Sequence, residues 1–384
     1  MKKLGISAIL AASIASSAFA GSVSLATDYL GDFLIAPFYQ AKGNVCTRVT
    51  IQNTNTTHSI LAKVAFREQI ASNEVDLPIF LSPGDVWDGR VCQGPNGDVY
   101  LTSSDDSNHP KILGTLKVGK DLTQQSKTAG HTNIDFTNGY VEVYPIAEFN
   151  EHSTAKVDKK VLVKRWDSLI EGQIPANTLR SGVDGYSLTG KVSFETKNTK
   201  VVTASEKMVA FKGAHNRVLT GSVIAYGNDT SPSVLLGNSK EIQILKKLQH
   251  SKALFTYDNG GKNQYIVFTY PFGYVDGQVR KFRVTIRDME ENKEETKVIF
   301  SPAPVINYEM RNEVAIVSVE KLIAGTNNPA KYQKGQIQIT DITNENDIQL
   351  GKGKHASFIA TLIRTNTDLN KNTIINDAIP VATK

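Results

Sequence analysis

The chain has 384 residues, of which 40% are hydrophobic and 21% are charged, and its formal net charge is +5. This hydrophobic share is too high for a disordered chain, and the length allows one large core or several smaller ones. The chain has 43 Lys and Arg residues and 38 Asp and Glu residues, and the basic residues are not concentrated in one stripe. A nucleic-acid partner is therefore not expected. Two cysteines exclude a multi-disulfide framework and a Cys-rich metal site.

The first 20 residues have the three-part pattern of a secretory signal peptide. Two lysines precede an uncharged run of 17 residues that ends in Ala18-Phe19-Ala20, where a signal peptidase reads small side chains. The alternative, a membrane anchor, would need about 20 apolar residues, and this run is shorter and contains four serines. We therefore expect cleavage between Ala20 and Gly21. The mature chain would carry a net charge of +3 and no membrane span, and would be located outside the cell or on its surface.

Export changes the interpretation of the only two cysteines, Cys46 and Cys92. Compartments outside the cytoplasm permit disulfides, and an isolated pair there favours one bridge. The alternative is two buried free thiols. We expect the Cys46–Cys92 bridge to join two strands of one sandwich.

Alternation with a period of two dominates the mature chain and predicts half-buried strands. It is found in residues 47–51, 139–144, 281–287 and 336–340. Two more continuous apolar runs, at residues 265–268 and 298–300, are typical of strands that are covered on both faces. Turn sequences such as Asn96-Gly97 and Asp184-Gly185 separate the strands.

Helical spacing is scarce. The best candidate is Lys240 to His250, where apolar residues recur at helical intervals behind a capping Ser239. A second candidate runs from Leu162 to Glu171 around Trp166. The predicted fold class is therefore all-β, a β-sandwich of the Ig-like or jelly-roll-like kind with one or two short helices.

The sequence defines the domain boundaries less sharply than the fold class. After the signal peptide (1–20), we expect an N-terminal β-sandwich region (21–135), a middle β region or insertion (136–250) and a C-terminal β-sandwich region (251–384). One elaborated sandwich and two packed sandwiches are equally compatible with this pattern.

None of the motifs specifies a reaction. Residues 114–120 have the spacing of a phosphate-binding loop, but Asp121 stands where a Ser or Thr must reach Mg²⁺, so we interpret them as a strand followed by a turn. No two histidines have metal-ligand spacing, and there is no G-x-S-x-G nucleophile motif. We expect no cofactor. Asp341 to Asp347 lacks the alternating acids and the Gly of a calcium loop, which argues against such a loop, while weak Ca²⁺ binding at Asp-rich loops stays open.

Large aromatic residues offer two interpretations. Trp87, Tyr100 and Tyr140 can line a sugar-binding platform or fill a sandwich core. Trp87 follows the Pro83-Gly84 turn at the start of a predicted strand, which favours the core.

One segment resembles a family of exported bacterial proteins of uncharacterised function. The similarity lies in Phe66-Arg67-Glu68, the following Glu74-Val75-Asp76-Leu77 and the turn Leu81-Ser82-Pro83-Gly84-Asp85-Val86-Trp87, and it covers about residues 34 to 92. The resemblance implies a β protein of the cell envelope or the extracellular space. It supplies no catalytic residues.

These observations favour a non-enzymatic structural subunit of a surface layer, filament or biofilm matrix that self-assembles into a homopolymer. Two alternatives stay open: an adhesin or carbohydrate-binding protein with surface glycans as partners, and a carbohydrate-active enzyme that uses two carboxylates.

A route to self-assembly lies at the new N-terminus. Residues 21–27 are a short alternating segment with Val23 and Leu25 on one face. Such a strand can add to the unpaired sheet edge of another copy, or it can pair within its own sandwich.

Overall fold

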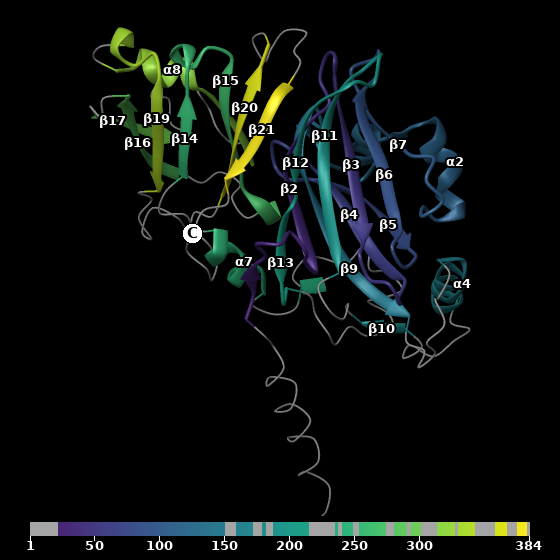
Figure 1. Cartoon of the computed structure of the whole chain (residues 1–384). Coiled ribbons are helices and arrows are strands. Elements are labelled where there is room, and N and C mark those ends of the chain that lie inside the picture. The colour runs from purple at the N-terminus through teal and green to yellow at the C-terminus, as the bar shows by residue number, and fades with distance from the viewer. Residues whose placement is uncertain are drawn as a thin grey trace, which may run out of the picture.

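The protein is an antiparallel, mostly β structure, as the alternation predicts. The computed structural model describes residues 22–149, 159–171, 179–181, 187–214, 235–236, 240–248, 253–273, 280–289, 293–300, 313–326, 329–341, 358–366 and 375–381. These residues form four antiparallel sheets, here named A to D, with short helices at their margins (Figure 1).

The first pair of sheets is built by the N-terminal half of the chain. Sheet A has the strand order β1-β13-β2-β9-β4-β5, with β10 also paired to β9, and sheet B has the order β12-β11-β3-β6-β7-β8. The strands of sheet A are β1 (Ser24–Leu25), β2 (Phe33–Gln40), β4 (Ile60–Glu68), β5 (Glu74–Leu81), β9 (Asn138–Phe149), β10 (Leu179–Ser181) and β13 (Val209–Lys212). The strands of sheet B are β3 (Val45–Asn53), β6 (Val86–Gln93), β7 (Val99–Thr102), β8 (Lys120–Asp121), β11 (Leu188–Thr196) and β12 (Val202–Lys207).

The second pair of sheets follows residue 252. Sheet C has the order β14-β19-β16-β17, and sheet D has the order β18-β15-β20-β21. The strands of sheet C are β14 (Ala253–Tyr257), β16 (Arg280–Asp288), β17 (Lys293–Phe300) and β19 (Gly335–Asp341). The strands of sheet D are β15 (Gln264–Thr269), β18 (Val314–Ser318), β20 (Ile359–Thr365) and β21 (Ile375–Val381).

The strands of residues 136–250 are woven into the first pair of sheets. Strand β9 lies between β2 and β4 in sheet A, and β11 lies beside β3 in sheet B. Residues that are distant in sequence therefore complete the same two sheets. The described strands form two sandwiches: sheets A and B face each other in the first, and sheets C and D in the second.

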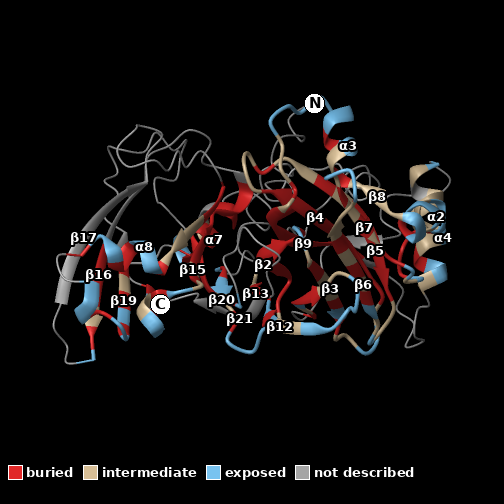
Figure 2. Ribbon diagram, turned by 90° about the horizontal axis from the view of Figure 1, so that it is seen from above, coloured by how far each residue is buried: buried red, intermediate tan, exposed pale blue. Residues whose placement is uncertain are grey.

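Burial follows this layering. One cluster fills the space between sheets A and B, and another fills the space between sheets C and D (Figure 2). The first cluster continues to Val267, Val314 and Ile363 of sheet D, while Ile266 and Phe268 of the same sheet belong to the other cluster. Sheet D therefore buries both faces, which explains the continuous apolar run at residues 265–268.

The helices lie around the sheets. They are α2 (Pro110–Val118), α3 (Leu122–Thr128), α4 (Lys159–Ile170), α7 (Lys240–Leu248) and α8 (Val319–Ala324), with short 3₁₀ turns η3 (Asn259–Gly261), η4 (Pro271–Gly273) and η5 (Pro329–Lys331). Helices α4 and α7 pack against the outer face of sheet A. The two helices predicted from spacing are confirmed as α4 and α7.

The interpretation of residues 114–120 as a strand and a turn is wrong, because residues 110–118 form α2. Pro110 occupies the first turn, where its missing N–H is not needed, and the His109 ring accepts the Lys111 N–H as an N-cap. Leu116 is buried, and Gly119 ends the helix with a φ of 116°.

The predicted Cys46–Cys92 bridge is confirmed. Cys46 lies on β3 and Cys92 on β6, and their Cα atoms are 4.7 Å apart. The register that pairs Thr47 with Val91 places the two cysteines opposite each other, so the bridge joins neighbouring strands of sheet B.

Candidate functional site

The N-terminal segment occupies the edge of sheet A. Strand β1 pairs antiparallel with β13, with Ser24 opposite Lys212 and Leu25 opposite Phe211. This is the alternative in which the segment pairs within its own sandwich. The expected cleavage site, Ala20 and Gly21, lies outside the described residues.

Both residues of the expected assembly strand contact a hydrophobic cluster on the outer face of sheet A. Val23 is 1% exposed, Leu25 is partly buried, and the cluster includes Phe33, Phe211 and Ile244. The Val23 N–H donates to Gln243 Oε1 of α7 at 3.0 Å. Side chains and backbone together hold this short strand at the edge of sheet A. We call this position the β1 slot; it is formed by β13, Gln243 of α7 and the cluster of Phe33, Phe211 and Ile244.

The turn from β1 to β2 closes the β1 slot. Asp28 Oδ2 lies 2.7 Å from Lys212 Nζ, and the hydrogen bond to this lysine, together with one from the Leu30 N–H, holds the Asp28 pKa below its usual range. Gly31 lies so close to β13 that a Cβ atom would be 2.7 Å from the Phe211 oxygen. The turn is thus fitted tightly against the strand that receives β1.

The opposite edge of sheet A is covered. Pro78 on β5 has no N–H to donate, and the Phe80 N–H donates to the Ser107 oxygen at 2.8 Å. Lys120 Nζ donates to the Asp76 oxygen at 3.1 Å. Proline and covering loops are common protections of an edge strand against pairing with another chain.

The turn that carries the resemblance is a structural element. Asn53 Nδ2 donates to the backbone oxygens of His58, Leu81 and Ser82, which fixes the start of the turn. The Ser82 and Val86 N–H groups donate to the Asp85 carboxylate at 3.2 and 3.0 Å.

Trp87 completes this turn from inside the core. It is fully buried, and its indole N–H donates to Asn108 Oδ1 at 2.8 Å. Tyr140 is also fully buried, and its hydroxyl lies 2.7 Å from Ser72 Oγ. The core interpretation of these two aromatic residues is confirmed, so neither ring is open to a sugar.

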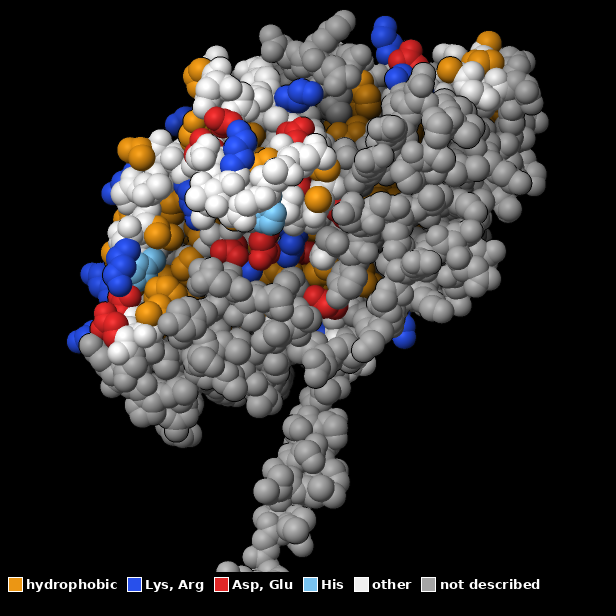
Figure 3. All heavy atoms as spheres, turned by 180° about the vertical axis from the view of Figure 1, so that it is seen from behind, with side chains coloured by type: hydrophobic (Ala, Val, Ile, Leu, Met, Phe, Trp, Pro, Cys, Tyr) orange, Lys and Arg blue, Asp and Glu red, His pale blue; other side chains and the backbone are white. Residues whose placement is uncertain are grey.

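A cluster of five charged side chains lies on the outer face of sheet A and is hereafter called the β4–β5 ion cluster; its members are Lys63, Arg67, Glu74, Asp76 and Glu142. Lys63 Nζ lies 2.8 Å from Asp76 Oδ2 and 3.0 Å from Glu74 Oε1, and the Lys63 side chain is 0% exposed. Arg67 Nη2 lies 2.7 Å from Glu74 Oε2, and Arg67 Nε pairs with Glu142. From behind, acidic and basic side chains lie beside one another on the described surface (Figure 3).

The β4–β5 ion cluster also contacts η4, the 3₁₀ turn that follows β15. Glu142 Oε1 accepts the Phe272 N–H of η4 at 3.1 Å, while Glu142 Oε2 accepts the Tyr144 hydroxyl at 2.6 Å. Burial is the largest single influence on the Glu74 pKa and acts to raise it, but Arg67 and Lys63 together outweigh burial and lower this pKa below its ordinary value. A buried salt bridge of this kind is costly to break, because the remaining charge loses its partner.

The sequence analysis missed this cluster. Lys63 and Arg67 are four residues apart on β4, and Glu74 and Asp76 are two residues apart on β5, so each pair points to one face. Opposite charges at alternate positions of two successive strands are the signal that could have found it.

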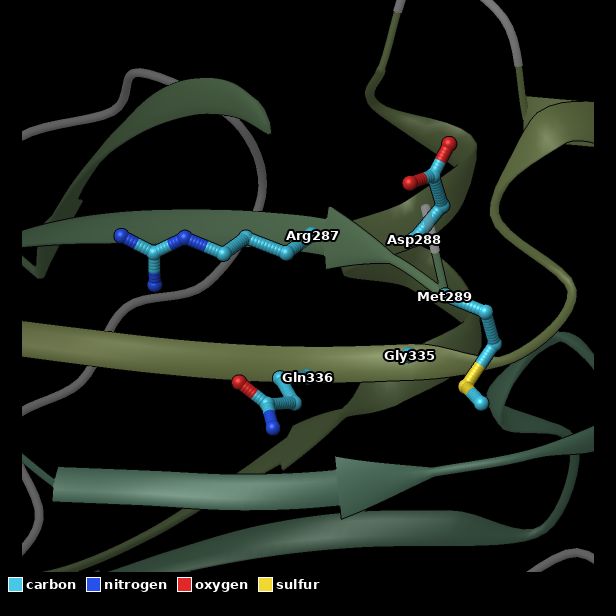
Figure 4. A pocket seen from close by; sticks show the side chains of 5 residues that line it. All are labelled: Arg287, Asp288, Met289, Gly335 and Gln336. Carbon is cyan, nitrogen blue, oxygen red and sulfur yellow. The ribbon is translucent and has the colours of Figure 1, made fainter. Parts of the chain in front are cut away.

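The second sandwich has a pocket of about 440 Å³ at the end of β16. It is lined by Arg287, Asp288, Met289, Gly335 and Gln336 (Figure 4). Arg287 Nη1 donates to Gln338 Oε1 at 3.1 Å, whereas Asp288 points away from Gln336 and lies 3.7 Å from Lys331 Nζ. The lining side chains do not converge on a common point.

Within the described ranges, no group of three or more His, Cys, Asp or Glu side chains is arranged to hold a metal ion. The loop that follows Asp341, considered above for Ca²⁺, lies outside those ranges. None of the described helices is long and apolar enough to cross a membrane.

The fold and the β1 slot define a protein of two joined β-sandwiches with an N-terminal edge strand. No protein-family model, curated protein or solved structure matches the chain.

Proposed function

We propose that the mature chain is an exported, non-enzymatic structural subunit that assembles outside the cell into a homopolymer by exchange of β1. The observation that carries this proposal is the β1 slot. A two-residue strand fills the edge of sheet A, and the side chains of its Leu25 and of the preceding Val23 pack into the cluster beneath it.

Exchange needs no new contact. The β1 strand of a second copy offers the same backbone groups to β13 and the same Val23 and Leu25 side chains to the cluster. Opening the turn from Thr27 to Asp32 releases β1 from its own sandwich. When each copy gives its strand to one neighbour and receives a strand from another, the contact is head-to-tail, does not close on itself and produces a fibre.

Two sequence features support the location. The leader resembles a secretory signal peptide, and cleavage after Ala20 would place Val23 close to the new N-terminus, where a strand is free of upstream chain. A disulfide on neighbouring strands is compatible with an oxidising compartment.

The test uses the register of β1. In the double variant Ser24→Cys/Lys212→Cys, the two new cysteines face each other across β1 and β13. An unexchanged chain forms this bond within itself, whereas an exchanged polymer forms it between copies and gives a ladder on a non-reducing gel. The single variant Ser24→Cys is the matched control, because one added cysteine can link no more than two chains.

A second comparison uses chains beginning at Gly21 and at Asp28. Electron microscopy should show polymers only for the longer chain. Bonds that form only within single chains in visible filaments would overturn strand exchange, and chains that stay monomeric at every concentration would overturn the structural function.

A further inference from the structure

We infer that Lys63 and Asp76 are joined by an amide bond between Lys63 Nζ and Asp76 Cγ, with Glu74 as the proton carrier. This modification concerns the β4–β5 ion cluster and is independent of polymer formation. It would be a second covalent link in the first sandwich, besides the Cys46–Cys92 bridge.

The strand register brings the reacting groups together. Lys63 stands opposite Pro78, and alternation places Pro78, Asp76 and Glu74 on the same face of β5. The Lys63 side chain therefore runs back along β5 and reaches Asp76 first, at 2.8 Å, and Glu74 next, at 3.0 Å. Groups held at such a distance react as if they were highly concentrated.

The two carboxylates have different roles. Glu74 is bound on its other oxygen by Arg67 Nη2 at 2.7 Å, which keeps it ionised and able to accept a proton. Asp76 is the nearer carboxylate and the one that loses an oxygen. The side chain of Asp76 is 15% exposed and that of Glu74 is 29% exposed, so a released water has a short path to solvent.

The reaction balances without an oxidant or a co-reactant. Glu74 passes one proton from the Lys63 ammonium to Asp76, and the resulting amine attacks Asp76 Cγ. The new N–C bond forms, Glu74 transfers a second proton from nitrogen to the departing oxygen, and the C–O bond breaks to release water. One hydrogen stays on the amide nitrogen, and Glu74 returns to its carboxylate form.

Burial favours the product. The ammonium of Lys63 is fully removed from solvent, and a buried ion pair keeps much of the desolvation cost of its two charges. A neutral amide removes both charges at once, while Arg67 keeps its contacts with Glu74 and Glu142. The bond would also fasten β5, the outermost strand of sheet A, to β4.

Intact-mass measurement of the reduced full-length chain tests the inference directly. The mass should be one water lower than the mass calculated for the isolated chain, which comprises residues 21–384 once the signal peptide is removed. Trypsin should leave Lys63 uncut and yield residues 49–67 joined to residues 68–90, with fragment ions that place the bond at Asp76. An unaltered mass with cleavage after Lys63, or a bond to another residue, would overturn the inference.

Variants separate the roles. Lys63→Arg keeps the positive charge and should restore the full mass, as should Asp76→Ala. Glu74→Gln should leave most chains unlinked after the time in which the unaltered chain is fully linked, and equal linkage in both would overturn the role of Glu74. Lys159→Arg is the matched control, because Lys159 also pairs with two carboxylates, Asp85 and an Asp106 side chain that is 80% exposed, but lies outside the β4–β5 ion cluster. This variant should still be lighter by one water.

Discussion

The two sandwiches are stabilised by different means. The first has sheets of seven and six strands, a disulfide between neighbouring strands, and the β4–β5 ion cluster. The second has two four-stranded sheets around an aromatic core that includes Phe255, Phe268 and Phe358, and among its described residues Lys331 Nζ lies 3.7 Å from Asp288 Oδ2.

The difference shows how the smaller sandwich depends on the larger one. Sheet D contributes Val267, Val314 and Ile363 to the core of the first sandwich. The N–H groups of Glu313 and Val314 donate to the backbone oxygens of Ile70 and Gln69, at 3.2 and 3.0 Å. Among the residues that the structure describes, the disulfide and the β4–β5 ion cluster lie in the first sandwich, and we expect the second to be stabilised by packing against it.

The largest effect is expected from Arg67→Ala. This change leaves Glu142, whose side chain is 0% exposed, without its cation and should lower the free energy of unfolding by about 3–5 kcal/mol. Urea denaturation followed by Trp fluorescence measures it. Arg48→Ala is the control: Arg48 is half-buried, and its partner Glu195 keeps Arg90, so a loss of at most about 1 kcal/mol is expected. Equal losses in both variants would contradict a special role of the cluster.

Removal of the disulfide should have the next largest effect. The double variant Cys46→Ala/Cys92→Ala opens a loop of 46 residues and should cost about 2–5 kcal/mol. Hydrogen exchange then distinguishes the sandwiches. Because they share a core, amides in β15 and β20 should lose protection together with those in β3 and β6. Loss confined to β3 and β6 would show that the second sandwich stands alone.

The smallest effect concerns Glu206 on β12, the edge strand of sheet B that lies beside β21. Glu206 is 4% exposed, and burial raises its pKa to about 8 although a backbone hydrogen bond from Phe38 acts in the opposite direction. In the unfolded chain, its pKa is close to the ordinary value of 4.5. Between pH 4.5 and about 8, Glu206 is therefore protonated in the folded state and ionised in the unfolded chain.

The stability contributed by Glu206 is therefore complete below pH 4.5 and is lost as the pH rises through about 8. The slope is at most about 1.4 kcal/mol for each pH unit. Thermal unfolding of Glu206→Gln between pH 5 and 9 should lack this decline, since the amide does not ionise. A variant that declines as steeply as the unaltered chain would exclude Glu206 as its source.

Local pattern was sufficient for many of the strands and for two of the helices. Alternation at residues 47–51, 139–144, 281–287 and 336–340 predicted strands that exist as β3, β9, β16 and β19. Helical spacing predicted α4 and α7. It failed at α2, because a helix of nine residues containing Gly114 has a weak pattern and depends on Pro110, the His109 cap and the contact of Leu116 with the core.

The sequence predicted the Cys46–Cys92 bridge, but it did not predict which two strands of which sheet the bridge joins. An exported chain with two cysteines favours one disulfide whatever the fold. That Cys46 and Cys92 stand opposite each other on β3 and β6 depends on the register of sheet B. The sequence analysis missed the β4–β5 ion cluster for the same reason. Glu142 contacts Arg67 because β9 lies between β2 and β4 in sheet A, which the sequence does not show.

The sequence by itself determined the all-β class, most of the strands and the disulfide, because these follow from side-chain period, turn residues and the count of cysteines. The tertiary structure alone decided which strands share a sheet, where β1 pairs, and which charges are buried together. These depend on contacts between residues that are far apart in the chain. The residue pattern of a strand predicts which of its faces is buried, and the neighbouring strands determine which residues that face contacts.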